Sequence, residues 1–391
     1  MSPAPLYTPA FGFACLVHFT GAMSLTMWVL FPLFVRTLGG NELTIGLILG
    51  VGLAVSVASR FIVGRLLDRF GRRVVLFWGA ALNALSYLTF LPLRSLGPAI
   101  FLLAALHLVV GGALFAAYFT YIGDLVPPSR RTEGIATFGV AGMIPNGLGP
   151  MLGEIVIVRL GYTGYFLVAC GFAVLSLALT LLLREPAPHA RGTVISMSVV
   201  ARTLGRGHVF DILLATVLFG AGMTAAFYFV APFTRDLAIA RAGPFFVTYA
   251  FTAAGARLIG REVLDHPRRA RLTLLGFALF AAGLLTLCLL PRPGVLLLAG
   301  MLAGAGGGLL FPVLQALCVE RTPPAIHGVV VSLYTGAIDA GTVLGAPLLG
   351  AIAHFAGYRW MFTTAAGVSL MGLGLMLVDI RRVQPASAVR E

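Results

Sequence analysis

The chain has few charged residues, and none of them is lysine. All 27 basic residues are arginines, 14 residues are acidic, and charged residues make up 10% of the 391 positions against 59% for hydrophobic ones. Soluble proteins carry roughly 25% charged residues. So little polar surface cannot cover a water-soluble body of this size, and the composition predicts an integral membrane protein. We attribute the missing lysine to genome composition.

Cysteines are also scarce and lack the spacing of paired ligands. The four, Cys15, Cys170, Cys288 and Cys318, fall within apolar runs. We expect them to be small hydrophobic residues of the core. Their spacing indicates neither a disulfide framework nor a metal cluster, and no cofactor is expected. Residues 1–9 have no basic stretch and no small-residue cleavage site, so no cleaved signal peptide is expected.

Apolar runs long enough to cross a bilayer recur along the whole chain. A helix needs about 20 residues to cross roughly 30 Å of hydrocarbon at 1.5 Å per residue. The predicted fold class is all-α, with nothing left over for a soluble catalytic domain. We predict twelve spans, at approximately 11–35, 43–66, 73–91, 97–123, 133–158, 161–184, 209–234, 243–260, 270–290, 294–318, 327–354 and 358–380.

The net charge of +13 is distributed unevenly between the two sides of these spans. Because arginine accumulates in cytoplasmic loops, both termini are predicted to be cytoplasmic. This topology accounts for the positive charge without a nucleic-acid partner. The predicted cytoplasmic group is Arg65, Arg69, Arg72, Arg73, Arg130, Arg131, Arg184, Arg191, Arg202, Arg206, Arg261, Arg268, Arg269, Arg271, Arg321, Arg381, Arg382 and Arg390, and the opposite side has Arg36, Arg94, Arg159, Arg235, Arg241, Arg292 and Arg359.

The second half of the sequence repeats the first after a shift of 196 residues, from Gly111 to Gly307 for example. This duplication predicts two pseudo-symmetric six-helix bundles, at 1–184 and 209–391, joined by a cytoplasmic linker at 185–208. Such a plan is typical of secondary transporters with a site between the repeats. The matching pairs include Gly112/Gly308, Phe115/Phe311, Asp124/Glu320, Pro127/Pro323, Gly161/Gly357, Tyr162/Tyr358, Phe166/Phe362 and Gly171/Gly367.

The loop between the second and third predicted spans reads Gly64-Arg65-Leu66-Leu67-Asp68-Arg69-Phe70-Gly71-Arg72-Arg73. It resembles the signature cytoplasmic loop of the major facilitator superfamily, Gly-x-x-x-Asp-Arg-x-Gly-Arg-Arg/Lys, at every characteristic position. A degenerate copy of this motif at 260–269 extends the resemblance over essentially the whole chain. In that family the loop is understood as a latch for the outward-facing state. The resemblance implies this role for Gly64, Asp68, Arg69, Gly71 and Arg72.

The fifth predicted span contains a row of glycines and prolines. It looks like the Gly-Pro-x-x-Gly-Gly element that antiporters of this superfamily carry in the same helix, although Pro145 and Glu154 replace two of its glycines. The resemblance favours efflux. An echo at 345–350 indicates that part of the pattern is packing common to both halves. The row is Gly142, Pro145, Asn146, Gly147, Gly149, Pro150, Gly153 and Glu154.

Two carboxylates, Glu154 and Asp339, lie well within predicted spans. A buried carboxylate is costly unless it is protonated, paired or hydrated, so both are candidates for binding and releasing a proton. The alternative for Asp339 is a structural or gating ion pair. Arg60 of the second span is its possible partner, and Arg257 occupies a similar place in the eighth.

Two histidines within spans are further candidates for proton coupling. They are His18 in the first span and His107 in the fourth. Histidine is the side chain that ordinarily titrates near neutrality. A lone buried histidine more often satisfies a backbone carbonyl, and this alternative stays open for both.

In this superfamily the first, fourth, seventh and tenth helices are understood to line the central cavity. The residues on these helices, with Asn146 of the fifth, are aromatic, methionine or small polar side chains. They favour an amphipathic or lipophilic organic solute over a sugar or a phosphate, unless they simply pack. The set is Thr20, Ser24, Met27, Trp28, Phe31, Tyr118, Tyr121, Asn146, Phe219, Met223, Phe227, Tyr228 and Gln315.

The resemblance implies a monomeric transporter of the bacterial inner membrane that moves a small organic solute by alternating access. Proton antiport in the direction of efflux is expected, with the proton gradient as energy source. Proton-coupled uptake of a small metabolite is the alternative. A lipid-acting membrane enzyme or a sensor is more distant, because the loops carry no nucleophile, metal-ligand or paired-acid motif. The expected partners are the substrate and the lipid bilayer.

Overall fold

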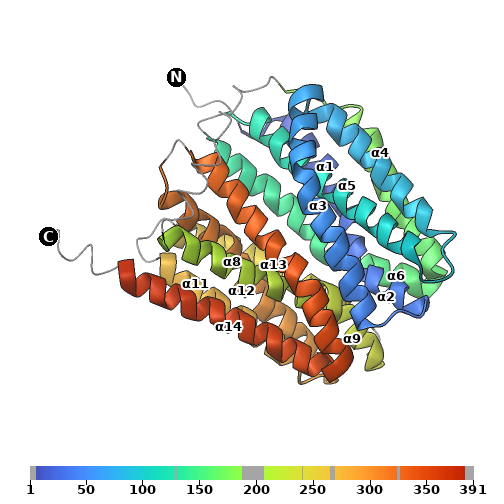
Figure 1. The fold of residues 1–391 in the computed structure, drawn as a ribbon. Coiled ribbons are helices and arrows are strands. Elements are labelled where there is room, and N and C mark those ends of the chain that lie inside the picture. Colours follow the sequence, from blue (N-terminus) through green and yellow to red (C-terminus); the bar gives the residue numbers. More distant parts are fainter. Residues whose placement is uncertain are drawn as a thin grey trace. The chain divides into compact units, whose positions relative to one another are not determined.

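The computed structural model describes residues 6–127, 130–186, 207–239, 241–264, 269–323 and 326–383. All regular secondary structure in these ranges is helical (Figure 1). The all-α prediction is therefore confirmed. The greater part of the predicted linker, and residues 265–268 of the second loop copy, lie outside the described residues.

The first half of the chain forms long helices joined by short turns. Thr8 caps the first helix, since its Oγ1 accepts a hydrogen bond from the Phe11 N–H at 3.2 Å, and Pro98 starts the fourth span, where its missing N–H costs nothing. The elements are α1 (Pro9–Met27), η1 (Trp28–Leu30), α2 (Phe31–Thr37), α3 (Glu42–Phe70), α4 (Arg72–Phe90), α5 (Pro98–Leu125) and α6 (Arg131–Thr180).

The second half follows the same plan. A five-residue π-helix, η3, interrupts its first span, close to the repeat position at which the short 3₁₀ segment η1 interrupts the first span of the chain. The elements are α8 (Gly207–Thr224), η3 (Ala225–Phe229), α9 (Val230–Asp236), α10 (Gly243–Leu264), α11 (Arg269–Leu287), α12 (Pro293–Glu320), α13 (His327–Ala356) and α14 (Tyr358–Val383).

Among the residues that the structure describes, ten helical stretches are long and apolar enough to cross a membrane. One of them contains α6, which is two helices joined at Gly161, whose φ of +68° breaks the helical path. A further helix, α10, has 22 residues, which is membrane length, although it contains Arg257. With α6 counted as two and α10 added, the described chain has twelve spanning helices, as the sequence predicts.

The chain forms two compact units. Unit 1 contains Met1–Asn41, Val51–Arg191 and Arg241–Val247, and unit 2 contains Glu42–Gly50, Gly192–Ala240 and Thr248–Glu391. Each unit therefore includes a short segment from the other half of the sequence. The predicted domain boundaries at 184 and 209, which follow the duplication, stay a prediction.

Glycines in α6 allow α1 to pack closely against it in unit 1. A Cβ at Gly149 would overlap the Thr26 hydroxyl, and one at Gly153 would lie 2.7 Å from Leu30 Cδ1. The Thr26 hydroxyl donates to the Pro145 carbonyl at 2.8 Å. The glycine row of the fifth span is therefore a helix-packing surface.

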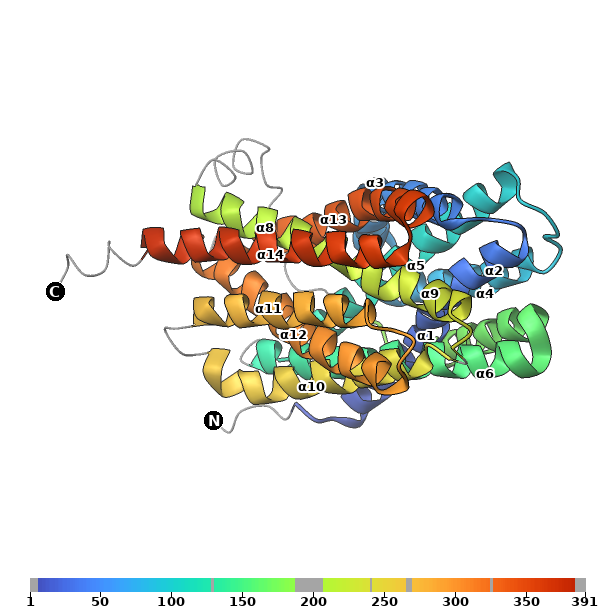
Figure 2. The ribbon, with the colours of Figure 1, turned by 90° about the horizontal axis from the view of Figure 1, so that it is seen from below.

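Unit 2 uses the same device between α8 and α13, which lie side by side in Figure 1. A Cβ at Gly341 would overlap the Val217 carbonyl, and one at Gly345 would lie 3.0 Å from Ala221 Cα. These contacts confirm the prediction that the echo of the glycine pattern serves packing. Figure 2 shows α14 between α8 and α11, and it packs against both helices.

Candidate functional site

The signature loop is folded around Gly71. This residue has a φ of +87°, which strains any other residue type, and a Cβ here would lie 2.7 Å from a Glu185 oxygen. The Glu185 carboxylate accepts hydrogen bonds from the N–H groups of Arg72 at 2.6 Å and Arg73 at 2.8 Å. It thereby satisfies free donors at the N-terminus of α4.

The Arg72 side chain is held inside unit 1. Its Nε lies 2.6 Å from Asp124 Oδ2, and both side chains are largely buried. The second half keeps the acid but uses the neighbouring arginine: Glu320, the repeat counterpart of Asp124, contacts Arg269, the counterpart of Arg73, at 2.5 Å in unit 2, where both groups are more exposed. Sequence reasoning used Asp124 and Glu320 only as markers of the repeat. An acid at the same place in both halves, together with a repeated run of two arginines, was the signal for this pair.

The remaining loop residues predicted for the latch face outward. Gly64 has no neighbour that a Cβ would touch, Asp68 is exposed, and the exposed Arg69 guanidinium lies 5.2 Å from the Phe70 ring centre. Arg60, earlier in the same helix, is exposed as well. Their role in a latch stays a prediction.

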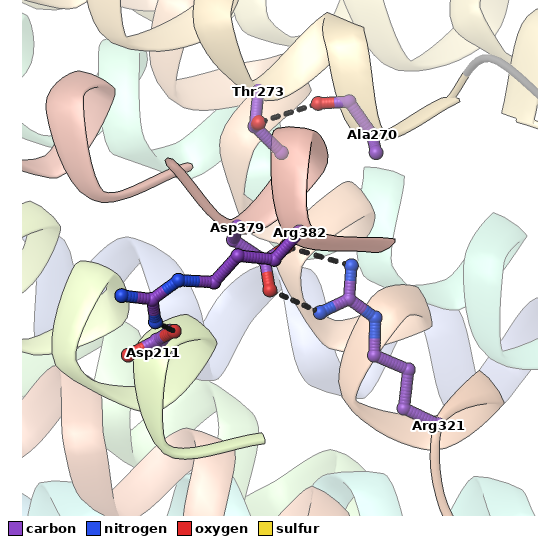
Figure 3. A network of polar contacts seen from close by, with 6 residues as sticks. All are labelled: Asp211, Ala270, Thr273, Arg321, Asp379 and Arg382. Carbon is purple, nitrogen blue, oxygen red and sulfur yellow. Dashed lines mark hydrogen bonds and ion pairs between the residues drawn. The ribbon is translucent and has the colours of Figure 1, made fainter. Parts of the chain in front are cut away.

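A second polar network, which was not predicted from the sequence, lies at the helix ends of unit 2 (Figure 3). The Arg321 guanidinium donates two hydrogen bonds of 2.7 Å to the fully buried Asp379 carboxylate. Beside it, Arg382 donates to Asp211 at 3.4 Å. These groups join the start of α8 and the ends of α12 and α14, which holds the ends of three helices together.

The interior of unit 1 contains a chain of buried polar groups around His107. Ser86 Oγ lies 2.8 Å from His107 Nδ1 and donates to the Asn83 carbonyl at 2.7 Å. Asn83 Nδ2 donates to Ser24 Oγ at 2.9 Å. The His107 ring also stacks on Trp28, with ring centres 4.0 Å apart. This histidine therefore has a hydrogen-bonded place in the core.

His18 lies in a separate aromatic cluster of unit 1. Its ring stacks on Phe138 at 4.3 Å and lies 4.9 Å from the Tyr118 ring. Gly142 makes the room, because a Cβ there would overlap the imidazole. A proton-coupling role for His18 and His107 stays a prediction, and in this structure both rings pack within their bundle.

The residues predicted to line the cavity fall into two groups. One group is buried within its own unit, which is the packing alternative that the sequence left open: Ser24, for example, donates to the Ala169 carbonyl at 2.9 Å, and Tyr118 shares a hydrogen bond with Ser176. The other group is half-buried. The buried group is Thr20, Ser24, Met27, Trp28, Phe31, Tyr118, Tyr121 and Phe219, and the half-buried group is Asn146, Met223, Phe227, Tyr228 and Gln315.

Asp339 lies within α13, where that helix packs against α8. A Cβ at Gly220 of α8 would overlap the carbonyl of Ile338, the residue before it. The Oδ2 atom of Asp339 is buried, and the phenol of Tyr228 in η3 lies within electrostatic range of this carboxyl group. The predicted coupling acid and one of the half-buried cavity candidates are therefore neighbours in unit 2.

Glu154 has an unexpected structural task. Its carboxylate accepts hydrogen bonds from the N–H groups of Ala242 at 2.7 Å and Gly243 at 2.6 Å. Both donors belong to the start of α10, so a buried acid of α6 caps a second helix within unit 1. Its coupling role stays a prediction.

Arg257 is a cation within α10 of unit 2. Its guanidinium lies 5.0 Å from the centre of the Phe311 ring. Its Nε is buried without a hydrogen-bond partner, and it forms no ion pair with a carboxylate whose side chain the structure describes. A cation–π contact returns roughly 0.5–2 kcal/mol, whereas desolvating an ion costs several kcal/mol. The described groups thus leave this charge only partly compensated.

Comparisons with known proteins agree with this geometry. The family model described as Major Facilitator Superfamily matches residues 13–291 and 212–390. An uncharacterised MFS-type transporter of Burkholderia pseudomallei (strain 1106a) is 29% identical over 406 residues, covering 97% of this chain and 95% of that protein. The staphylopine export protein of Staphylococcus aureus (strain Mu50) is 24% identical over 391 residues, covering 92% and 93%. The crystal structure of the nucleoside transporter NupG has the same fold, with a TM-score of 0.73 at 13% identity over 95% of this chain and 99% of that chain.

Proposed function

Because the chain belongs to the Major Facilitator Superfamily of multi-pass membrane transporters, we propose that it exports a small amphipathic or lipophilic organic solute in exchange for protons. The two bundles would rock about a midplane site, so that the site opens to one side of the membrane at a time. The proton gradient supplies the energy, and no cofactor takes part. The lipid bilayer and the solute are the partners of a monomer.

The position of Asp339 carries the proton-coupling part of this proposal. An ionisable group within a spanning helix is expensive to keep and usually functional. Asp339 lies in α13 with one buried carboxylate oxygen, next to Tyr228 in the π-helical turn of the seventh span. Single π-helical turns occur frequently at functional sites. Uptake of a proton by Asp339 would therefore change the charge beside the π-helical turn of the seventh span.

Two observations support export of an amphipathic or lipophilic solute. The half-buried side chains on the seventh span include Met223, Phe227 and Tyr228, and apolar walls with few fixed charges suit an amphipathic guest. The staphylopine export protein, a relative over nearly the whole chain, is an exporter by name.

The arginine-rich loops support placement in the bacterial inner membrane with both termini in the cytoplasm.

The test begins with the purified full-length protein. A thermal-shift screen of organic solutes identifies a ligand, because a compound at 100 times its Kd raises stability by about 2.7 kcal/mol. Everted membrane vesicles with an acidified interior should then accumulate the labelled ligand, and collapse of the proton gradient should release it. Accumulation in right-side-out vesicles instead would establish uptake.

Asp339→Asn should abolish proton-driven accumulation while sparing ligand binding and solute exchange, because the amide cannot carry a proton. Glu133→Gln is the matched control: it removes a carboxylate at the start of α6 that pairs with Arg130 at 2.9 Å and is partly exposed. This control should transport nearly as well as the native protein. Undiminished proton-driven flux in the Asp339 variant would remove Asp339 from the coupling role.

A further inference from the structure

Two closely packed helices fix the place of Arg257 in unit 2. A Cβ at Gly304 of α12 would overlap the Thr252 hydroxyl of α10, and one at Gly308 would lie 2.5 Å from the Ala253 carbonyl. Because helices approach this closely only through small residues, these glycines set the register between α10 and α12. One turn further on, the register brings Arg257 over the face of Phe311.

The surroundings of the Arg257 guanidinium are aromatic and carry no described negative charge. The phenols of Tyr249 and Tyr334 are within electrostatic range. Tyr334 is committed elsewhere, since its hydroxyl donates to the Phe311 carbonyl at 2.6 Å. Tyr249 contacts Met223 through a 3.4 Å hydrogen bond to sulfur. The cation thus has π-faces and neutral phenols around it, and its Nε donor remains unused.

Tyr249 links the surroundings of this cation to half-buried residues of the seventh span. The Phe227 ring meets the Tyr249 ring edge-on, with centres 5.0 Å apart, so η3 and α10 are in contact here. Phe227, Phe311 and Arg257 are all half-buried. Through Phe311 and Tyr249, a fixed positive charge is therefore connected to a group of aromatic and methionine side chains within one compact unit.

We propose that Arg257 binds the anionic end of the transported solute, which makes the substrate an amphipathic organic anion such as an aromatic carboxylate or sulfonate. The guanidinium offers several donors in a planar fork that matches a carboxylate or sulfonate. The apolar body of the solute lies against Met223, Phe227 and Phe311. This inference rests on the proposed transport of an organic solute and specifies its charge.

The test compares two probes of nearly equal shape, 1-naphthoate and its neutral amide, 1-naphthamide. Binding to the full-length protein is measured by calorimetry in nanodiscs of phosphatidylcholine, which contain no anionic lipid that could occupy the site. We expect the native protein to bind the anion about tenfold more tightly than the amide, since a charge-assisted hydrogen bond is worth that factor. Equal affinity of the native protein for the two probes overturns the proposal.

Arg257→Gln should remove this preference by weakening 1-naphthoate binding about tenfold while leaving 1-naphthamide binding unchanged. Arg257→Lys keeps the charge without the fork and should retain a reduced preference. Arg381→Gln, an exposed change of the same kind at the end of α14, should behave as the native protein. A preference that survives in Arg257→Gln overturns the proposal. If that variant fails to fold, the lysine variant and the native probe pair still decide.

These measurements use no proton gradient, so they separate the two proposals. If the native protein shows no preference for the anion, the anion site is rejected, while the proposal of proton-driven export of a neutral solute stands. Absence of any proton-driven flux, with the Arg257-dependent preference present, would instead keep the anion site and reject the coupling.

Discussion

Charged side chains in this protein differ chiefly in whether burial leaves them a partner. Asp379 is fully buried and receives both arms of the Arg321 guanidinium. Arg257 has an aromatic face and an unused donor. Asp68 is exposed to solvent. The same unit charge therefore has a structural use in the first case, a proposed binding use in the second, and little effect on stability in the third.

Neutralising Asp379 should destabilise the protein strongly. Asp379→Asn removes the negative charge that the Arg321 guanidinium contacts, and breaking a buried pair in this way costs about 3–5 kcal/mol. The thermal unfolding midpoint of the purified protein in nanodiscs should fall clearly. Asp68→Asn, an exposed change of the same chemistry, should shift stability by no more than about 0.5 kcal/mol. Similar midpoints for both variants would contradict the structural role of the Arg321–Asp379 pair.

At the scale of elements, the duplicated glycines at the joints between the last two helices of each half have one physical purpose. Gly161 has a φ of +68° and Gly357 a φ of +88°. A Cβ at either position would meet no other atom within 4 Å. Space is therefore not the constraint, and the left-handed backbone alone requires glycine. The sequence predicted a break at 158–161, and the structure gives its cause.

Gly161→Ala and Gly357→Ala should each cost about 1–2 kcal/mol, because an L-residue in this backbone region is strained. The duplication supplies matched controls, Gly171 and Gly367, which lie inside helices and also have free space around the missing Cβ. Alanine there should be neutral or stabilise by about 0.5–1 kcal/mol, since it lowers the entropy lost on folding. Chemical unfolding of the four variants measures the difference. Equal effects at all four positions would refute backbone strain as the reason.

At the scale of the whole molecule, the distribution of arginine sets the proposed orientation. Arg65 lies in the signature loop and Arg94 after α4, and both are exposed. In a variant without the four native cysteines, we expect a membrane-impermeant maleimide added to intact cells to label Arg94→Cys and to spare Arg65→Cys. Everted vesicles should give the reverse. Labelling of Arg65→Cys from outside would invert the proposed topology.

The sequence alone determined the membrane class, the twelve spans, the duplication and the family. Each of these depends on composition, length or spacing along the chain, which are local properties. The glycine of the signature loop belongs here too, because the φ of +87° at Gly71 is a backbone requirement of that one residue. The family match over residues 13–291 and 212–390 agrees with these predictions.

Only the tertiary structure decided which side chains meet. Three contacts join residues that are far apart in sequence. Glu185 accepts from the start of α4, Asp379 accepts from Arg321, and Glu154 accepts from the start of α10. Helices that face lipid are apolar nearly all round, so the sequence carries no stripe that fixes their rotation. Rotation and register follow from where small residues let backbones touch, as Gly304 and Gly308 do beside Arg257. For this reason the residues predicted for the cavity divided into buried and half-buried groups only once the helices were packed.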